Sequence, residues 1–228
     1  WSEATERFCD YDKRQFARDV IALLDVLELD RVKLAGHDWG GWTGFLVSMM
    51  APERVDRYVA MNIPPPWLDP GPFELVKTLK ALSRLGYQVI MATPGISRFA
   101  QAGPGRKFFA DGIIKSARRR EAWAGGALDV YLDQFKSPRR SNATMYIYRN
   151  FLLRELPQIQ LGKYISGRLT TPTMLLFGMA MSLFDATPEG GAILAPPPAQ
   201  HAARVRPAAG KSLLRGAMRL GRLTAELA

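Results

Sequence analysis

Val-Lys-Leu-Ala-Gly-His-Asp-Trp-Gly-Gly, residues 32–41, is the stretch that decides the fold of this chain. Its first four residues predict a short buried strand, and the apolar residues 42–51 predict a helix buried behind a sheet. Between them, Gly36 and Gly40 flank Asp38, two residues before and two residues after it. This spacing predicts a sharp strand-to-helix turn that raises the Asp38 side chain above the sheet edge. The alternative is an ordinary glycine-rich turn in a βαβ unit.

Helix and strand patterns alternate on either side of this turn. Asp12 and Gln15 have the spacing of a capping box, ahead of an amphipathic helix over 13–28. Pro52 ends the buried helix, and residues 55–63 are typical of the next strand. Helix, strand, helix and strand in this order predict an α/β fold, with a mostly parallel sheet flanked by helices.

The pattern changes at Pro64-Pro65-Pro66, where the alternation stops. Helical stretches rich in aromatic residues follow through about residue 168, and no strand is evident among them. A strand pattern returns at 172–177. We therefore expect a helical insert between two strands of one sheet.

Two strings then carry a family resemblance: Ala35-Gly36-His37-Asp38-Trp39-Gly40-Gly41 and Met61-Asn62-Ile63-Pro64. They resemble the epoxide hydrolase and haloalkane dehalogenase branch of the α/β-hydrolase superfamily, and the bacterial soluble-type epoxide hydrolases in particular. The resemblance extends to about residue 180. It implies an α/β-hydrolase core at 1–63, an inserted helical cap at 64–168, and the last part of the core at 169–228.

In this branch a carboxylate attacks carbon and forms an alkyl-enzyme ester, which water then hydrolyses. We expect Asp38 to be that nucleophile, and the backbone N–H of Trp39, at a helix N-terminus, to stabilise the oxyanion. The strings Tyr87-Gln88 and Tyr146-Ile147-Tyr148 resemble the two segments that carry the cap tyrosines of epoxide hydrolases. The resemblance thus implies that Tyr87 and Tyr148 polarise an epoxide oxygen and that one of them protonates it.

Other interpretations stay open at this stage. Each tyrosine could be a half-buried packing residue with a solvated hydroxyl. Tyr146, two residues from Tyr148, faces another direction on a helix and is expected to be structural. A haloalkane dehalogenase, which needs N–H donors for a halide, and an inactive remnant or basic binding module are the alternative functions.

The second half-reaction needs a histidine base and an acid that orients it, and neither is visible. The family acid position holds Met181, with Asp185 the nearest carboxylate, and the family histidine position holds Lys211. Another acid position holds Asn62. His37 adjoins the nucleophile and should point away from it, and His201 lies ten residues before the family position. We therefore expect impaired turnover.

Both ends of the sequence depart from the family. The first strands and a His-Gly-x-Pro loop, which supplies a second oxyanion donor, are absent before residue 1, so we expect a truncated start. Residues 186–228 contain eleven alanines and five prolines but no aspartate. A reading-frame slip near residue 180 or a divergent C-terminal lid would explain this composition.

Composition and charge bound the remaining expectations. Residues 1–100 contain 12 Lys/Arg and 13 Asp/Glu, whereas residues 101–228 contain 19 and 8. No nucleic-acid motif accompanies the basic half, so we expect solvated charge rather than nucleic-acid binding. The single cysteine indicates a cytoplasmic chain, and no apolar run suits a membrane. We expect an epoxide substrate, no metal or organic cofactor, and consider a homodimer.

Overall fold

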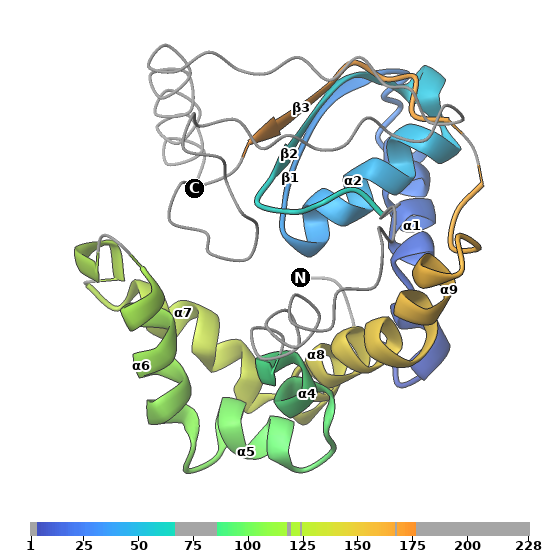
Figure 1. Cartoon of the computed structure of the whole chain (residues 1–228). Coiled ribbons are helices and arrows are strands. Elements are labelled where there is room, and N and C mark those ends of the chain that lie inside the picture. Colours follow the sequence, from blue (N-terminus) through green and yellow to red (C-terminus); the bar gives the residue numbers. More distant parts are fainter. Residues whose placement is uncertain (1–3, 67–85, 118–119, 124, 167, 177–228) are drawn as a thin grey trace, which may run out of the picture. The chain divides into compact units, whose positions relative to one another are not determined.

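The computed structural model describes residues 4–66, 86–117, 120–123, 125–166 and 168–176 (Figure 1). Its contacts divide the chain into two compact units. Residues 1–16 and 70–165 form a helical unit, and residues 17–69 and 166–228 form an α/β unit. The expected boundaries at residues 63 and 168 remain a prediction, but the first sixteen residues group with the helices.

The α/β unit contains a parallel sheet of the strands β1 (Val32–His37), β2 (Val55–Met61) and β3 (Thr173–Leu176), in that order. Helix α2 (Trp39–Met50) packs against β1 and β2, and the short 3-10 helix η2 (Pro52–Arg54) leads into β2. This arrangement confirms the α/β fold and the parallel sheet that the alternating pattern predicts. It also confirms that β3 joins the sheet after a long helical insertion.

Burial differs between the strands. Val55, Tyr58 and Ala60 of the central strand β2 are at most 1% exposed. Strand β1 lies at the edge of this three-stranded sheet and alternates between half-buried and exposed residues. The prediction of a buried strand at residues 32–35 is therefore wrong, because successive side chains of β1 point to opposite faces of the sheet and every second one is exposed.

Helix α2 is buried on every side, as its sequence predicts, from Gly41 to Met49. Its residue Phe45 packs edge-to-face on the ring of Tyr58, with ring centroids 5.1 Å apart. The Tyr58 hydroxyl donates to the carbonyl of Gly41, and burial raises the pKa of Tyr58 well above its ordinary range. A Cβ on Gly44 would lie 2.5 Å from the Tyr58 ring, so the helix needs a glycine at this contact.

The helical unit has no strand among its described residues, as expected for the insert. Its central helix is α8 (Pro138–Asn150), which packs against α4 (Gly86–Ala92), α5 (Ile96–Ala102) and η1 (Phe8–Tyr11). The elements are η1 (Phe8–Tyr11), α4 (Gly86–Ala92), α5 (Ile96–Ala102), α6 (Arg106–Ser116), η3 (Arg120–Trp123), α7 (Ala127–Asp133), η4 (Gln134–Lys136), α8 (Pro138–Asn150), the π-helical turn η5 (Phe151–Glu155) and α9 (Leu156–Gln160).

Helix α1 (Lys13–Val26) begins at the predicted residue. Asp12 accepts from the backbone N–H of Arg14 at 2.9 Å. The backbone N–H of Lys13 donates to the carboxylate of Glu155 at 2.7 Å. A residue distant in sequence therefore supplies part of the N-terminal cap.

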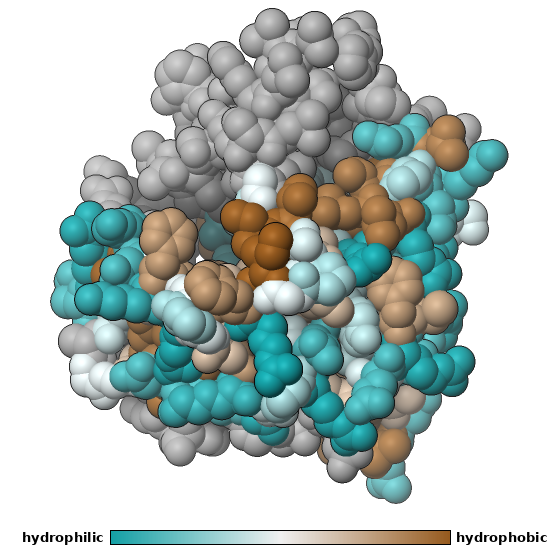
Figure 2. All heavy atoms as spheres, turned by 90° about the horizontal axis from the view of Figure 1, so that it is seen from below, coloured by the Kyte–Doolittle hydropathy of each residue, from teal (hydrophilic) through white to brown (hydrophobic). Residues whose placement is uncertain are grey.

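The apolar stripe of α1 is only partly covered by described residues. Leu24 is buried, whereas Leu23 is 54% exposed, and Leu27, just after the end of α1, is 55% exposed. Figure 2 shows one face of the molecule, on which hydrophobic side chains lie among hydrophilic ones. The amphipathic pattern thus predicts the helix correctly but does not establish the burial of each apolar residue.

Candidate active site

Asp38 lies directly between the end of β1 and the start of α2. Its backbone has φ 52° and ψ −126°, outside the regions that side-chain-bearing residues favour. Such a conformation costs about 1–3 kcal/mol and persists where the surrounding structure enforces it, often at active sites. The strand-to-helix turn predicted from residues 36–41 is therefore present, and Asp38 is its strained residue.

Close packing of the backbone explains the glycines of this turn. A Cβ on Gly36 would lie 2.4 Å from the carbonyl oxygen of Gly40, and one on Gly41 would lie 2.5 Å from Ile63. A Cβ on Gly40 would meet no described atom within 4 Å. The sequence pattern therefore identifies Gly36 correctly. On the helix side of the turn, it is Gly41 and not Gly40 whose missing side chain lets α2 lie close to Gly36 and Ile63.

The carboxyl ends of β1 and β2 place a small group of polar residues next to Asp38. The N–H of Asp38 donates to the carbonyl of Met61 at 3.1 Å, so Asp38 is held beside the end of β2. The following residue, Asn62, also has a positive φ, 51°. Its side-chain nitrogen lies 3.4 Å from Nε2 of His37. His37 is thus paired with Asn62 at this edge, consistent with a role other than that of the base.

Trp39 is the first residue of α2. Its N–H lies in the first turn of a 12-residue helix, where the helix dipole favours negative charge. The carbonyl of Trp39 accepts from the Thr43 hydroxyl at 2.9 Å, which fixes this first turn. The backbone geometry is compatible with the oxyanion role expected for Trp39, and that role remains a proposal.

The helical unit brings Tyr87 and Tyr148 together. Tyr87 lies in the first turn of α4 and Tyr148 near the end of α8. Their rings pack edge-to-face with centroids 5.8 Å apart and an interplanar angle of 81°. Tyr87 is 47% exposed, whereas its neighbour Gln88 is buried. Two phenols from segments 61 residues apart in sequence thus form one pair.

Tyr146 has different surroundings from Tyr148. Its ring packs against Tyr11 at 5.4 Å and against Phe8 at 6.0 Å. It therefore anchors η1 to α8, which agrees with the structural role expected for it.

Sequence reasoning missed two buried polar features of the helical unit. One is Gln88, whose side-chain nitrogen lies 3.4 Å from the Tyr87 hydroxyl. The other is the ion pair of Lys13 and Glu155, with 2.9 Å between Nζ and Oε2 and both side chains fully buried. Burial raises the pKa of Glu155, against the opposing effect of Lys13. No local pattern marks either feature, although Gln88 is adjacent to a tyrosine that the resemblance identifies.

The remaining candidates lie outside the described residues. They are Met181 at the expected acid position, Asp185 near it, Lys211 at the expected base position, and His201. Among the residues that the structure does describe, no group of three or more His, Cys, Asp or Glu side chains could hold a metal ion.

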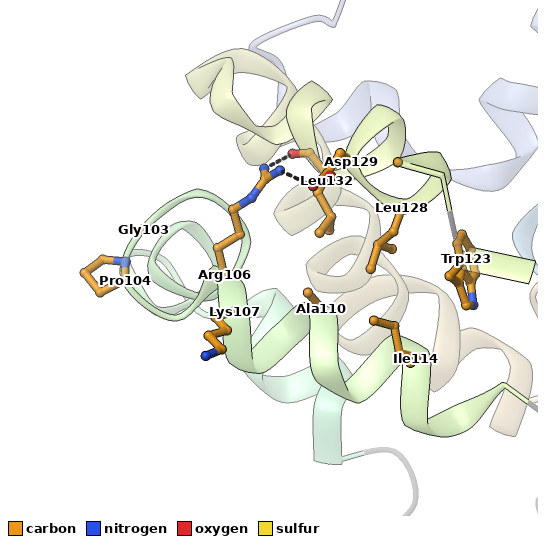
Figure 3. A pocket seen from close by; sticks show the side chains of 11 residues that line it. Gly103, Pro104, Arg106, Lys107, Ala110, Ile114, Trp123, Leu128, Asp129 and Leu132 are labelled. Carbon is orange, nitrogen blue, oxygen red and sulfur yellow. Dashed lines mark hydrogen bonds and ion pairs between the residues drawn. The ribbon is translucent and has the colours of Figure 1, made fainter. Parts of the chain in front are cut away.

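A separate cavity of about 530 Å³ lies between α6 and α7 (Figure 3). Arg106 borders it, and its guanidinium donates to the carbonyl of Leu132 at 2.7 Å and pairs with Asp133 at 2.5 Å. Lys136 and Arg106 lower the pKa of Asp133. Neither Tyr87 nor Tyr148 lines this cavity, so the tyrosine pair and the cavity are distinct features.

Comparison with known proteins identifies the architecture. A family model described as the alpha/beta hydrolase fold matches residues 2–92. A solved structure of a proposed acyltransferase from Salmonella enterica superimposes with a TM-score of 0.68 and 19% identity, covering 99% of this chain and 73% of that chain. This chain has the α/β-hydrolase fold. A likeness at this level of identity shows the fold alone.

Sequence relatives include epoxide hydrolases. The chain is 38% identical to epoxide hydrolase 2 of Caenorhabditis elegans over 58 residues, 25% of this chain and 16% of the relative. It is 26% identical to human epoxide hydrolase 4 over 169 residues, 70% of this chain and 43% of the relative. The chain is therefore similar to epoxide hydrolases over part of their length, and these matches span less than half of each relative.

Helices long and apolar enough to cross a bilayer do not occur in the described part of the chain.

Proposed function

We propose that this chain opens epoxides by nucleophilic attack of Asp38. A carboxylate oxygen of Asp38 forms a bond to a ring carbon, and the bond between that carbon and the ring oxygen breaks. The electron pair passes to the ring oxygen, which takes a proton from Tyr87 or Tyr148. The product is a hydroxyalkyl ester of Asp38, and hydrolysis of this ester by water would release a diol.

The observation that carries this proposal is the pairing of Tyr87 with Tyr148 in a chain whose strained turn residue is an aspartate. A strained carboxylate at the strand-to-helix turn suits attack on carbon, whether the leaving group is a halide or an epoxide oxygen. Two adjacent phenols supply the acid that only an epoxide needs, because its oxygen leaves as an alkoxide. The names of the curated relatives support the same reaction class.

We further propose that ester hydrolysis limits turnover in this chain. Hydrolysis needs a base to activate water, and the residues at the expected acid and base positions are Met181 and Lys211, which cannot form a carboxylate–histidine dyad. The side chain of Asn62 is likewise no carboxylate. The ester should therefore accumulate on Asp38 rather than release diol repeatedly.

The full chain incubated with styrene oxide tests the proposal by intact mass spectrometry and by assay of the released diol. We expect a gain of one substrate mass that forms more slowly in Tyr87→Phe and Tyr148→Phe. Tyr131→Phe, at a 63% exposed tyrosine of the helical unit, is the matched control and should form the adduct at the parent rate.

Three results would contradict parts of this account. No mass gain would contradict Asp38 as a nucleophile toward epoxides. Halide release from a bromoalkane that is unchanged in both tyrosine variants would favour a haloalkane dehalogenase instead. Sustained diol release over many equivalents would contradict the proposed block in ester hydrolysis.

A further inference from the structure

Gln88 is a buried polar residue that the proposed reaction does not yet use. It lies in α4 next to Tyr87 and is 6% exposed. Its side-chain nitrogen donates to the Tyr87 hydroxyl at 3.4 Å. Its side-chain oxygen, which is buried, has no hydrogen-bond partner among the residues that the structure describes. A buried amide that directs its donor at a phenol is not explained by packing alone, because an apolar side chain of similar size would fill the same space without burying unpaired polar atoms.

We propose that Gln88 is a positioning residue for Tyr87, an inference that rests on the proposed function. A phenol oxygen accepts hydrogen bonds as well as donating one. When the Gln88 amide occupies the oxygen as a donor, the phenol proton must point elsewhere and is available for the epoxide oxygen. Gln88 thereby fixes the direction in which Tyr87 donates.

The same contact supports the proton transfer itself. When Tyr87 gives up its proton, negative charge develops on the phenol oxygen. An N–H donor already aimed at that oxygen stabilises the charge without reorganisation, as donors in an oxyanion hole do. The contribution of Gln88 therefore grows as the epoxide opens, and it should affect the rate of ring opening more than the binding of substrate.

Gln101 provides a matched control in the neighbouring helix α5. It is also fully buried, and its side-chain nitrogen donates to the hydroxyl and the carbonyl of Ser97 at 2.6 and 3.2 Å. Its oxygen has no partner among the described residues either. The two glutamines differ in the partner of the amide nitrogen, which is a tyrosine of the proposed site in one case and a serine of the same helix in the other.

The experiment measures single-turnover formation of the styrene oxide adduct by rapid quench and intact mass, over a range of substrate concentrations. We expect Gln88→Leu to lower the limiting rate about tenfold and to leave the half-saturating concentration unchanged. Gln88→Glu, which keeps the size but replaces the donor by an acceptor that captures the phenol proton, should be slower still. Gln101→Leu should react at the parent rate.

The Tyr87→Phe background separates positioning from packing. Because Gln88 acts through the Tyr87 oxygen, Gln88→Leu should cause no further loss once that oxygen is gone. A spectroscopic readout accompanies the kinetics: the ¹³Cζ resonance of Tyr87, assigned by its absence in Tyr87→Phe, should shift in Gln88→Leu and stay in place in Gln101→Leu.

The outcomes distinguish this inference from the proposed function. If the parent chain forms an adduct but Gln88→Leu matches Gln101→Leu, only the positioning role is overturned. It is also overturned if Gln88→Leu slows the reaction equally with and without the Tyr87 hydroxyl, or if the Tyr87 resonance does not move. If the parent chain forms no adduct, the proposed function fails, and this inference fails with it.

Discussion

Asp38 combines a strained backbone with a position between two tightly packed elements. The strain at φ 52° is maintained because the glycines around it let the strand and the helix approach each other. Gly36 is the critical glycine, because a Cβ at this position would overlap the backbone of Gly40. Backbone cannot move aside as a flexible side chain can. The geometry of the proposed nucleophile therefore depends on residues that take no part in the proposed chemistry.

A pair of glycine substitutions tests this dependence. Gly36→Ala should lower the free energy of unfolding by about 1–3 kcal/mol, because the added methyl group overpacks a backbone contact. Gly40→Ala should be neutral or slightly stabilising, because the site is open among the described atoms and alanine favours a helix. Urea denaturation followed by circular dichroism measures both. Equal stabilities of the two variants would contradict the packing argument.

At the scale of elements, the start of α1 depends on a residue far along the chain. Glu155 lies in the π-helical turn η5 and is fully buried with Lys13. Lys13 also donates to the carbonyl of Ile147 at 3.1 Å, in the helix that carries Tyr148. This ion pair joins residues that are 142 positions apart, and it fixes the N-terminal segment to the centre of the helical unit.

Removal of one partner of this pair should be costly. Lys13→Met leaves the Glu155 carboxylate buried without its counter-charge, and we expect a loss of about 3–5 kcal/mol in unfolding free energy. The double variant Lys13→Met/Glu155→Leu should recover most of that loss, because neither charge remains. Thermal and urea unfolding of Lys13→Met, of Glu155→Leu and of the double variant complete a double-mutant cycle. Additive losses would show that the pair is not coupled.

Asp12 gives the start of α1 a dependence on pH. Burial alone would raise the pKa of Asp12, but hydrogen bonds from Arg14 and its charge outweigh burial and lower it. Stability from the ionised form is therefore present above the ordinary pKa of about 4 and is lost as pH falls through the lower pKa of the folded state.

We expect Asp12→Ala to cost about 1–2 kcal/mol near neutral pH, because it removes a cap acceptor. The difference from the parent chain should shrink in acid, where the parent also loses its carboxylate. Asp12→Asn keeps an acceptor oxygen without the charge, so its unfolding free energy should lie between the two at neutral pH. Urea titrations at several pH values provide the measurement. A difference that grows as pH falls would contradict the lowered pKa.

At the scale of the whole molecule, the sequence predicted the features that neighbouring residues encode. It did not predict the features that depend on contacts between distant residues. Glycine spacing around Asp38 and the apolar run after it placed β1 and α2 to within a few residues, and Pro52 with the strand pattern that follows it placed β2, because these features are encoded by neighbours in sequence. The exposure of β1 depends on what covers each face of the sheet, and the Lys13–Glu155 pair depends on the fold of the helical unit. Neither is visible in a window of adjacent residues.

In the candidate site, too, some residues were predicted from the sequence and one was not. The family resemblance identified Tyr87 and Tyr148, and the structure shows that they pack against each other. Gln88 was overlooked because α4 has only seven residues, too few for a periodic pattern to indicate which side chains are buried.

The accumulated ester has a consequence for turnover by the whole chain. If hydrolysis lacks its base, substrate consumption should stop near one equivalent per chain, and almost no diol should be released while the adduct persists for hours. Hydroxylamine, an external nucleophile toward esters, should then cleave the adduct, release the bound diol and leave Asp38 as a hydroxamate, which cannot attack a second epoxide. Quantification of diol and of intact mass over time measures this, and continued diol formation without a persistent adduct would contradict it.

The most direct test of the central claim locates the covalent bond. The full chain is reacted with styrene oxide, digested, and sequenced by tandem mass spectrometry. We predict one substrate mass on the peptide that contains residues 36–41, assigned to the Asp38 side chain and absent from Asp38→Asn. An adduct on another residue, or one that survives in Asp38→Asn, would contradict Asp38 as the nucleophile.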